Sequence, residues 1–209
     1  MTSSQTTPPQ ARDRIYRSPA GIAGGVVLIL IGAWLGIDAV VNGEGRTPWT
    51  ALAGLLFAVP LVVAFTIRPA VFGNEERLRV RNPFRDVSLP WSTVSGFKSG
   101  YSNEVVDEAG TKYQLWSIPV SLRGRRKAQR QQMRAAKGGR TPTGASGLPV
   151  TDQRSTGDQA MDELRELHEA HAAAEAETTQ GTTKVRWAYE IIAPALVGAV
   201  LLVSLLAFG

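Results

Sequence analysis

The sequence predicts a membrane protein with three transmembrane α-helices and a small antiparallel β domain flanked by charged helical segments. Three runs of about 20 residues are almost entirely apolar, which is long enough to cross the roughly 30 Å hydrocarbon core of a bilayer. Between the second and the third run, apolar and polar residues alternate, as is typical of strands with one buried face. The net charge of +5 over 209 residues averages these very different segments, so we consider charge segment by segment.

The first two apolar runs predict a helical hairpin. We assign residues 1–18 to a tail, residues 19–41 to the first transmembrane helix and residues 49–67 to the second, with a short polar turn between the helices. A cleavable signal peptide has a shorter apolar core than the first run, and it ends at a small-residue cleavage site. We therefore interpret the first run as a retained helix.

One face of the first predicted helix carries small residues. At about 100° per residue, four glycines fall within about 60° of one another around the helix axis. Such a stripe lets another helix approach closely, and we expect it to pack against the second helix of the same chain, with homo-oligomerisation as the alternative. The four residues are Gly21, Gly25, Gly32 and Gly36.

The third apolar run, residues 187–208, predicts a third transmembrane helix. Lys and Arg are concentrated in the tail and in residues 68–186, whereas the hairpin turn has Arg46 against Glu44. By the positive-inside rule, the N-terminus and residues 68–186 are cytoplasmic, and the C-terminus lies outside. Arginine outnumbers lysine, and alanine and glycine are abundant, which favours a bacterial source. We therefore expect a multi-pass protein of the bacterial plasma membrane.

Residues 68–119 predict a small antiparallel sheet of four or five strands. Residues 76–82 and the following DVSLPW stretch form one predicted hairpin, which turns through NPFR. A second predicted hairpin turns at residues 107–110, where a glycine can adopt positive φ. Apolar residues share one face of each predicted strand, so we expect one face of the sheet to be packed.

Short motifs within this region resemble a known family. The chain has RP where it leaves the second apolar run, L-x-V-R-N-P at residues 78–83, P-W at residues 90–91 and L-W-S-I-P at residues 115–119. These elements resemble the bacterial PH-like domain of the low molecular weight protein antigen 6 family, found in actinobacterial membrane proteins with two spans directly before the domain. The resemblance implies a partial PH-like β fold for residues 68–119. It also implies a membrane-bound protein that is not an enzyme.

Charged segments follow the predicted β domain. Residues 120–137 are predicted to form a basic helix, and residues 138–157 have the Gly, Pro, Ser and Thr content of a flexible linker. Residues 158–177 predict an acidic amphipathic helix with its apolar residues on one face. Pairing between the acidic and the basic helix across the linker is one interpretation of these charges.

The sequence shows no group of residues suited to catalysis. Cysteine is absent, and no P-loop, nucleophile elbow or dinucleotide-binding motif occurs, so we expect no enzyme and no cofactor. His168 and His171 share a helix face, but the chain has only two histidines, so we interpret them as packing residues and expect no metal site. Asp38 and Glu190 lie near helix ends, which gives a transport path little support.

Basic side chains are the main candidates for binding. The basic helix has no aromatic residue to stack on bases, so we expect no nucleic-acid binding. Near an anionic leaflet each Lys or Arg contributes about 1 kcal/mol, which makes lipid headgroups candidate partners. PH domains that bind phosphoinositides place the basic residues of the site around the first strand–strand loop. The strand arginines of this chain depart from that arrangement. The candidate anionic-surface residues are Arg123, Arg125, Arg126, Lys127, Arg130, Arg134, Arg77, Arg79 and Arg81.

The predicted function follows from these segments. We expect an integral membrane protein that displays a PH-like domain to the cytoplasm as a non-catalytic protein-interaction or scaffold module, with other membrane proteins as candidate partners. Anionic-lipid sensing through the basic helix is the alternative, and an accessory subunit of a transporter is a further one. A purely solubilising and topogenic role for the basic residues also stays open.

Overall fold

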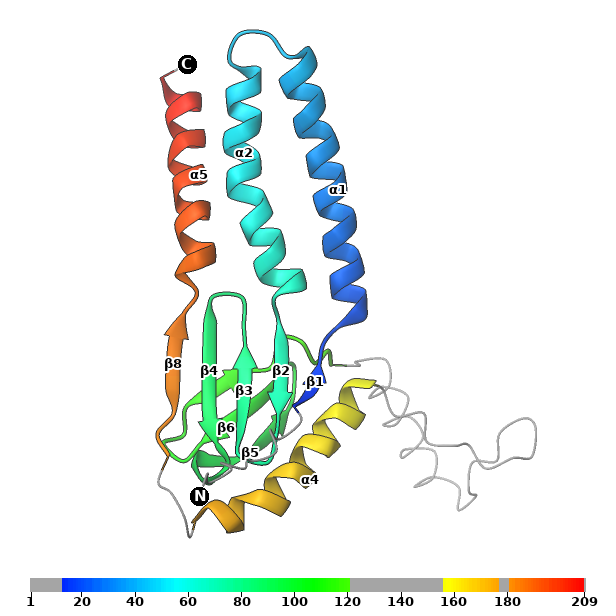
Figure 1. Cartoon of the computed structure of the whole chain (residues 1–209), viewed down its shortest axis with the longest axis vertical. Coiled ribbons are helices and arrows are strands. Elements are labelled where there is room, and N and C mark those ends of the chain that lie inside the picture. The colour runs from blue at the N-terminus through cyan, green and yellow to red at the C-terminus, as the bar shows by residue number, and fades with distance from the viewer. Residues whose placement is uncertain (1–12, 121–155, 177–180, 209) are drawn as a thin grey trace, which may run out of the picture.

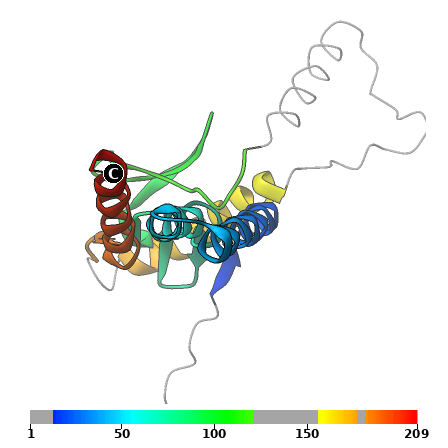
Figure 2. The same ribbon diagram turned by 90° about the horizontal axis from the view of Figure 1, so that it is seen from above.

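The computed structural model describes residues 13–120, 156–176 and 181–208. Three apolar helices stand side by side on a β domain, and a further helix lies across the opposite end of that domain (Figure 1). Seen from above, the three apolar helices form a row, with the second helix of the chain between the first and the last (Figure 2). The β domain is therefore attached to one end of a layer of helices.

The apolar helices are α1 (Pro19–Asn42), α2 (Thr47–Val62) and α5 (Tyr189–Ala207). The π-helical turn η1 (Val63–Ile67) continues α2 directly. α1 begins with a capping interaction, in which the Ser18 hydroxyl oxygen accepts a hydrogen bond of 3.2 Å from the N–H of Gly21. All three segments are long and apolar enough to cross a membrane, judged by length and composition.

Two antiparallel sheets form the β domain. In spatial order, the five-stranded sheet consists of β1 (Arg14–Tyr16), β2 (Ala70–Gly73), β3 (Arg77–Arg81), β4 (Arg85–Pro90) and β8 (Lys184–Trp187). The three-stranded sheet consists of β5 (Val94–Ser99), β6 (Asn103–Asp107) and β7 (Lys112–Gln114). A 3-10 turn, η2 (Trp91–Thr93), leads from the first sheet into the second. β3–β4 and β6–β7 are the two predicted hairpins, and Gly110 in the second turn has φ of 80°.

The edges of the five-stranded sheet correct the predicted architecture. Residues 14–16, which we assigned to a tail, pair with β2. Residues 184–187, whose last residue we assigned to the third helix, pair with β4, and α5 begins only at Tyr189. The expected single sheet is therefore two sheets. Both edge strands are very short and adjoin an apolar helix, so their alternation is too brief to be recognised from the sequence alone.

The core of the β domain lies between the sheets and is closed by α4 (Thr156–Ala176), which begins two residues before the predicted acidic helix. α4 places Met161 and Leu164 against the core, where they are 1% and 0% exposed. Burying a large apolar side chain contributes about 1.5–3 kcal/mol, so α4 is a structural part of the domain. The core from the sheets includes Val71, Leu78, Val80, Val87, Leu89, Trp91, Val105 and Leu115.

Three short junctions connect the five-stranded sheet to the apolar helices. Two residues separate β1 from α1, two separate η1 from β2, and Ala188 alone separates β8 from α5. The N–H of Ala188 donates a hydrogen bond of 2.9 Å to the carbonyl oxygen of Phe84, so strand pairing continues up to the first turn of α5. The end of the sheet that carries these junctions is therefore held against the helices.

Candidate functional site

Most of the predicted basic candidates cannot be placed. All but the first residue of the predicted basic helix and nearly all of the predicted linker fall within residues 121–155, outside the part of the chain that the structure describes. Their pairing with α4 stays a prediction for the same reason. The candidates concerned are Arg123, Arg125, Arg126, Lys127, Arg130 and Arg134.

The three predicted strand arginines lie on the outer face of the five-stranded sheet. Arg77, Arg79 and Arg81 alternate along β3 with two fully buried residues, so their side chains point away from the core. Nε and Nη2 of Arg79 donate hydrogen bonds of 2.9 and 2.6 Å to the two carboxylate oxygens of Asp86 on β4. Nε of Arg81 lies 3.7 Å from the same carboxylate. Two of the three arginines therefore share one acidic partner.

The charges around Asp86 shift three pKa values. Burial alone raises the pKa of Asp86, but the hydrogen bond from Arg79 and the charges of Arg79 and Arg81 outweigh it and hold that pKa below its usual range. The hydrogen bond to Asp86 raises the pKa of Arg79. Burial and the charge of Arg79 lower the pKa of Arg81, and the charges of Arg68 and Arg17 lower it further. Arg81 therefore lies where positive charge is in excess.

Arg81 belongs to a row of charged residues at the end of the sheet that adjoins the apolar helices. The register pairs Arg81 with Asp86, and Asp86 with Arg186. On its other side Arg81 pairs with Ala70, and the chain that leaves β1 brings Arg17 to the same level. Together with two residues at the helix junctions, this row forms what we call the helix-side rim: Arg17, Arg68, Arg81, Asp86, Arg186 and Glu190.

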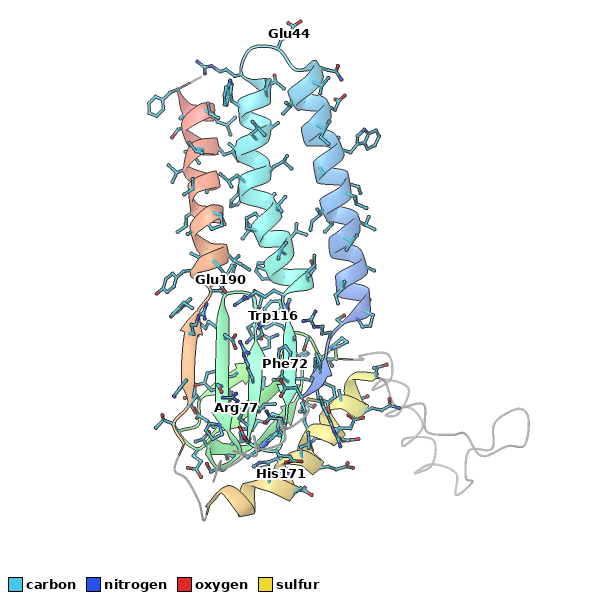
Figure 3. All side chains as sticks on the ribbon, in the orientation of Figure 1. Glu44, Phe72, Arg77, Trp116, His171 and Glu190 are labelled. Carbon is cyan, nitrogen blue, oxygen red and sulfur yellow. The ribbon has the colours of Figure 1, made fainter. Side chains whose placement is uncertain are left out.

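Two arginines of the rim meet Glu190 at the start of α5. Nη1 of Arg68 is 3.2 Å from one carboxylate oxygen of Glu190, and Nη2 of Arg186 is 3.6 Å from the other. Nε of Arg68 also donates a hydrogen bond of 3.2 Å to the carbonyl oxygen of Asn82, and its side chain is only 12% exposed. Figure 3 shows Glu190 at the junction of α5 with the sheet. These contacts hold the ends of two apolar helices together.

Aromatic side chains gather at the same end of the sheet. Phe65 of η1 packs edge-on against Phe84 and Trp116, with ring centroids 5.3 and 5.6 Å away. Cζ of Arg85 lies 4.4 Å from the ring centroid of Trp187. Phe65 and Trp116 stay 44% and 45% exposed, and Figure 3 shows Trp116 next to the apolar helices. Tryptophans such as Trp116 and Trp187 are typical of the layer where a bilayer meets water.

The far end of the sheet carries Arg77 and the β2–β3 loop. β2 begins next to the apolar helices and runs away from them, so the loop after Gly73 lies at the far end, where Figure 3 shows Arg77. At about 3.3 Å per residue, this loop is roughly 20 Å from the last helical residue. The N–H groups of Glu76 and Arg77 each donate a hydrogen bond of 2.9 Å to Oδ1 of Asn74, which closes the loop. The first strand–strand loop of residues 68–119 therefore faces away from the helices.

The two histidines of α4 are packing residues. His168 lies between Trp91 and Phe97, with ring centroids 6.0 and 6.1 Å away, and burial lowers its pKa. Nδ1 of His171 lies 2.8 Å from the carbonyl oxygen of Leu167, one turn earlier on the same helix. Among the described residues, no three metal-binding side chains come together.

A hydrogen bond ties α4 to the edge strand β1. The Tyr16 hydroxyl donates to a carboxylate oxygen of Glu163 over 2.8 Å. Burial, this hydrogen bond and the negative charge of Glu163 raise the pKa of Tyr16 to about 12. The helix that closes the core is thus bonded to the strand that leads into α1.

The predicted glycine stripe of α1 faces α2 and η1. A Cβ at the buried Gly25 would lie 2.7 Å from Cβ of Thr66, and one at the buried Gly36 would lie 3.1 Å from Cγ of Leu55. Gly32 also faces Leu55, at 3.7 Å, and Gly21 faces the carbonyl oxygen of Thr66, at 3.5 Å. This geometry is that of hairpin packing within one chain.

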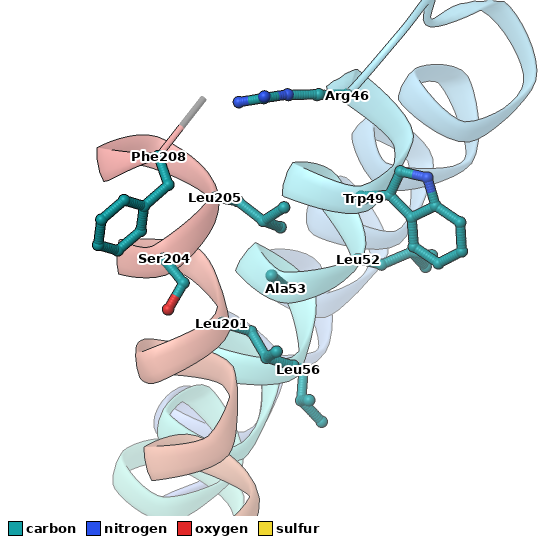
Figure 4. A pocket seen from close by; sticks show the side chains of 9 residues that line it. All are labelled: Arg46, Trp49, Leu52, Ala53, Leu56, Leu201, Ser204, Leu205 and Phe208. Atoms are coloured by element: carbon teal, nitrogen blue, oxygen red, sulfur yellow. The ribbon is translucent and has the colours of Figure 1, made fainter.

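An apolar groove of about 660 Å³ lies between the ends of α2 and α5 that are farthest from the sheet (Figure 4). It opens beyond the contact of Gly198 with α2, where a Cβ would lie 2.7 Å from the carbonyl carbon of Leu56 and 2.8 Å from Cα of Phe57. Sequence reasoning missed this contact, since a single glycine within an apolar run gives no stripe. The groove is lined by Arg46, Trp49, Leu52, Ala53, Leu56, Leu201, Ser204, Leu205 and Phe208.

Comparison with known proteins identifies the β domain. Residues 68–143 match a family model described as Bacterial PH domain, which supports a bacterial PH-like domain in this part of the chain. Neither the curated proteins nor the solved structures contain a match to the chain. β1, α4 and β8 lie outside the matched residues, although they complete the outer sheet and the core.

Proposed function

We propose that this protein is a multi-pass membrane protein that displays its PH-like domain at one membrane surface as a non-catalytic protein-interaction or scaffold module. The observation that carries this proposal is the set of three short junctions between one sheet and the apolar helices. A single flexible linker lets a domain turn in any direction, whereas three short junctions fix which surface faces the bilayer. The domain therefore presents constant surfaces to its partners.

The free edge of β8 supports a protein partner. Within the part of the chain that the structure describes, β8 is the last strand of the five-stranded sheet, and all four of its residues are exposed. Val185 and Trp187 are 46% and 43% exposed, so apolar side-chain surface lies along this edge. A free edge with apolar side chains is a surface on which a partner can add a strand. This edge lies directly next to α5, so it suits another membrane protein.

The distribution of charge supports a cytoplasmic position for the domain. Most Lys and Arg residues of the chain fall in residues 68–186, and the turn between α1 and α2 has only Arg46. By the positive-inside rule, the sheet side is cytoplasmic and that turn lies outside, in the bacterial plasma membrane. The motifs at residues 78–83 and 115–119 support membership of the antigen 6 family in particular.

Single-cysteine labelling tests insertion and orientation, because the chain has no cysteine of its own. Glu44→Cys lies in the turn between α1 and α2, and Ser95→Cys lies on β5; both positions are exposed. In intact cells we expect a membrane-impermeant maleimide to label the first variant, and to label the second only after lysis. The reverse pattern would overturn the orientation, and labelling of both without lysis would overturn membrane insertion.

Site-directed photocrosslinking in native membranes tests the interaction role. A short cysteine-linked crosslinker at Val185→Cys probes the free edge of β8, and Glu108→Cys in the β6–β7 turn is the matched exposed control. We expect a discrete protein adduct from Val185→Cys that Glu108→Cys does not give. Adducts with lipid alone from Val185→Cys would contradict a protein partner at this edge.

A further inference from the structure

The positive charges of the helix-side rim outnumber its negative charges. It contains four arginines and two acids, Asp86 and Glu190. Arg79, one row farther from the helices, takes both carboxylate oxygens of Asp86. Asp86 is therefore shared with a residue outside the rim, so it offsets less of the positive charge of the rim than the sequence alone indicates.

Two of the rim arginines have unused hydrogen-bonding capacity. Nε of Arg81 is buried without a hydrogen-bond partner, and its distance of 3.7 Å from Asp86 is too long for one. For Arg17, the described part of the chain offers no hydrogen bond or ion pair, and the side chain is exposed. Arg68, in contrast, is fixed by Glu190 and Asn82. In the rim, the guanidinium group of Arg68 is therefore held by protein groups, whereas those of Arg17 and Arg81 have N–H donors left to bind an anion.

The rim lies at the level of lipid headgroups once the helices are inserted. Arg17 is two residues before α1, Arg68 directly follows η1, and Arg186 is three residues before α5. The headgroup layer of each leaflet is roughly 5–8 Å thick, a depth that two or three residues of extended chain cover. Close to this level, the half-exposed Phe65 of η1 packs against the half-exposed Trp116, which follows β7.

We propose that the helix-side rim binds the phosphate of an anionic phospholipid in the leaflet next to the sheet, with Arg17 and Arg81 as the principal contacts. The inference rests on the membrane insertion proposed above, but not on the protein-interaction role. Guanidinium groups bind phosphate through paired N–H donors, and the Arg81 side chain, whose Nε is buried and has no partner, is still 29% exposed and so presents the rest of its guanidinium group to an anion. A zwitterionic lipid leaves the excess charge of the rim in place, so the site selects lipids with net negative charge.

This site lies elsewhere in the domain than the loop with which PH domains bind phosphoinositides. That loop, between β2 and β3, faces away from the helices, whereas the rim is built from the opposite ends of the strands and includes three residues outside residues 68–143. Arg17 and Arg186 come from those flanking segments. The lipid site therefore depends on the attachment of the domain to the three helices.

Lipid retention by the full-length chain in nanodiscs tests this site. Nanodiscs of phosphatidylcholine alone are compared with nanodiscs that also contain phosphatidylglycerol, and lipids retained after gentle release are counted by native mass spectrometry. We expect preferential retention of phosphatidylglycerol, and a decrease of about fivefold for each of Arg17→Gln and Arg81→Gln, the factor for one guanidinium near an anionic surface. Arg81→Lys keeps the charge and serves as the folding control for Arg81→Gln.

Two control variants, each of which also loses one arginine, distinguish specific lipid binding at the rim from non-specific electrostatic attraction. Arg46→Gln removes one arginine on the other side of the helices, and Arg77→Gln removes one at the far end of the same sheet. Both are expected to retain phosphatidylglycerol as the unmodified chain does. Equal losses in all the glutamine variants, or no preference for phosphatidylglycerol, would overturn the proposal.

Two further results show whether the bound phosphate belongs to a lipid, and whether a negative outcome concerns the site or the membrane insertion of the chain. Inorganic phosphate added to phosphatidylcholine nanodiscs is expected to leave the thermal unfolding midpoint unchanged, whereas phosphatidylglycerol raises it. An equal rise with inorganic phosphate would overturn the assignment to a lipid. A chain that does not enter nanodiscs at all would instead contradict the proposed membrane insertion.

Discussion

Replacing Gly198 by alanine tests the contact that sets the distance between α2 and α5. A Cβ at this position would lie 2.7 Å from the carbonyl carbon of Leu56 and 2.8 Å from Cα of Phe57, and these backbone atoms cannot rotate away. Ordinary contact begins at 3.4 Å, and the backbone N of Phe57 lies nearer still, so the helices must separate by at least about 0.7 Å at this point. Overpacking of this kind costs about 1–3 kcal/mol, and we expect the free energy of unfolding to fall by that amount.

The matched control for Gly198→Ala is Gly24→Ala on α1, where a Cβ would have no atom within 4 Å. Alanine has a higher helix propensity than glycine, so we expect Gly24→Ala to leave the free energy of unfolding unchanged or to raise it by up to about 1 kcal/mol. The assay is SDS-induced unfolding of the full-length chain in mixed micelles, followed by tryptophan fluorescence. Equal free energies of unfolding for Gly198→Ala and Gly24→Ala would refute the close contact between α2 and α5.

Three further predictions concern the β domain. Asp86→Asn leaves the guanidinium groups of β3 unpaired, so we expect a lower thermal midpoint than for Arg77→Gln; an equal midpoint would contradict the charge argument. Burial lowers the pKa of His168 in the folded chain, so its stabilising contribution is present above about pH 6.5 and decreases as the pH falls; His168→Gln is expected to remove this slope and His171→Gln to keep it. The pKa of about 12 for Tyr16 predicts that this tyrosine ionises about two pH units late in an absorbance titration, and that stability falls as the pH rises from about 10 to 12. Burial also raises the pKa of Tyr113, so Tyr16→Phe is expected to remove the two-unit delay and to reduce the loss of stability.

The parts of the fold that the sequence predicts are those with long or repeated patterns. The apolar helices follow from runs of about 20 residues, and the β3–β4 and β6–β7 hairpins follow from alternation around turn residues such as Gly110. β1 and β8 have three and four residues, and they are strands because β2 and β4 offer free edges. Their existence is a property of tertiary pairing, which local sequence does not contain.

The candidate site was only partly predictable for a related reason. The arginine stripe of β3 is visible from its alternation with Leu78 and Val80, but its neutralisation is not visible until β4 is placed beside it. A tight turn through residues 82–85 puts Asp86 opposite Arg81, so this part of the rim could have been found by drawing the hairpin register. Arg17 and Arg186 could not, because they reach the rim through edge strands far apart in the sequence.

Sharing of Asp86 connects the lipid site to the outer face of the sheet. Asp86 is hydrogen-bonded to Arg79 and lies near Arg81, so its charge is divided between the outer face and the rim. A partner that offers a carboxylate to Arg79 frees Asp86 for Arg81 and reduces the positive charge that a lipid phosphate meets. Because the coupling free energy between two sites is reciprocal, anionic lipid at the rim must weaken acidic partners at Arg79 by the same factor. We therefore expect anionic lipid to weaken the binding of acidic partners at Arg79, and we expect Asp86→Asn to abolish this coupling while leaving both surfaces cationic.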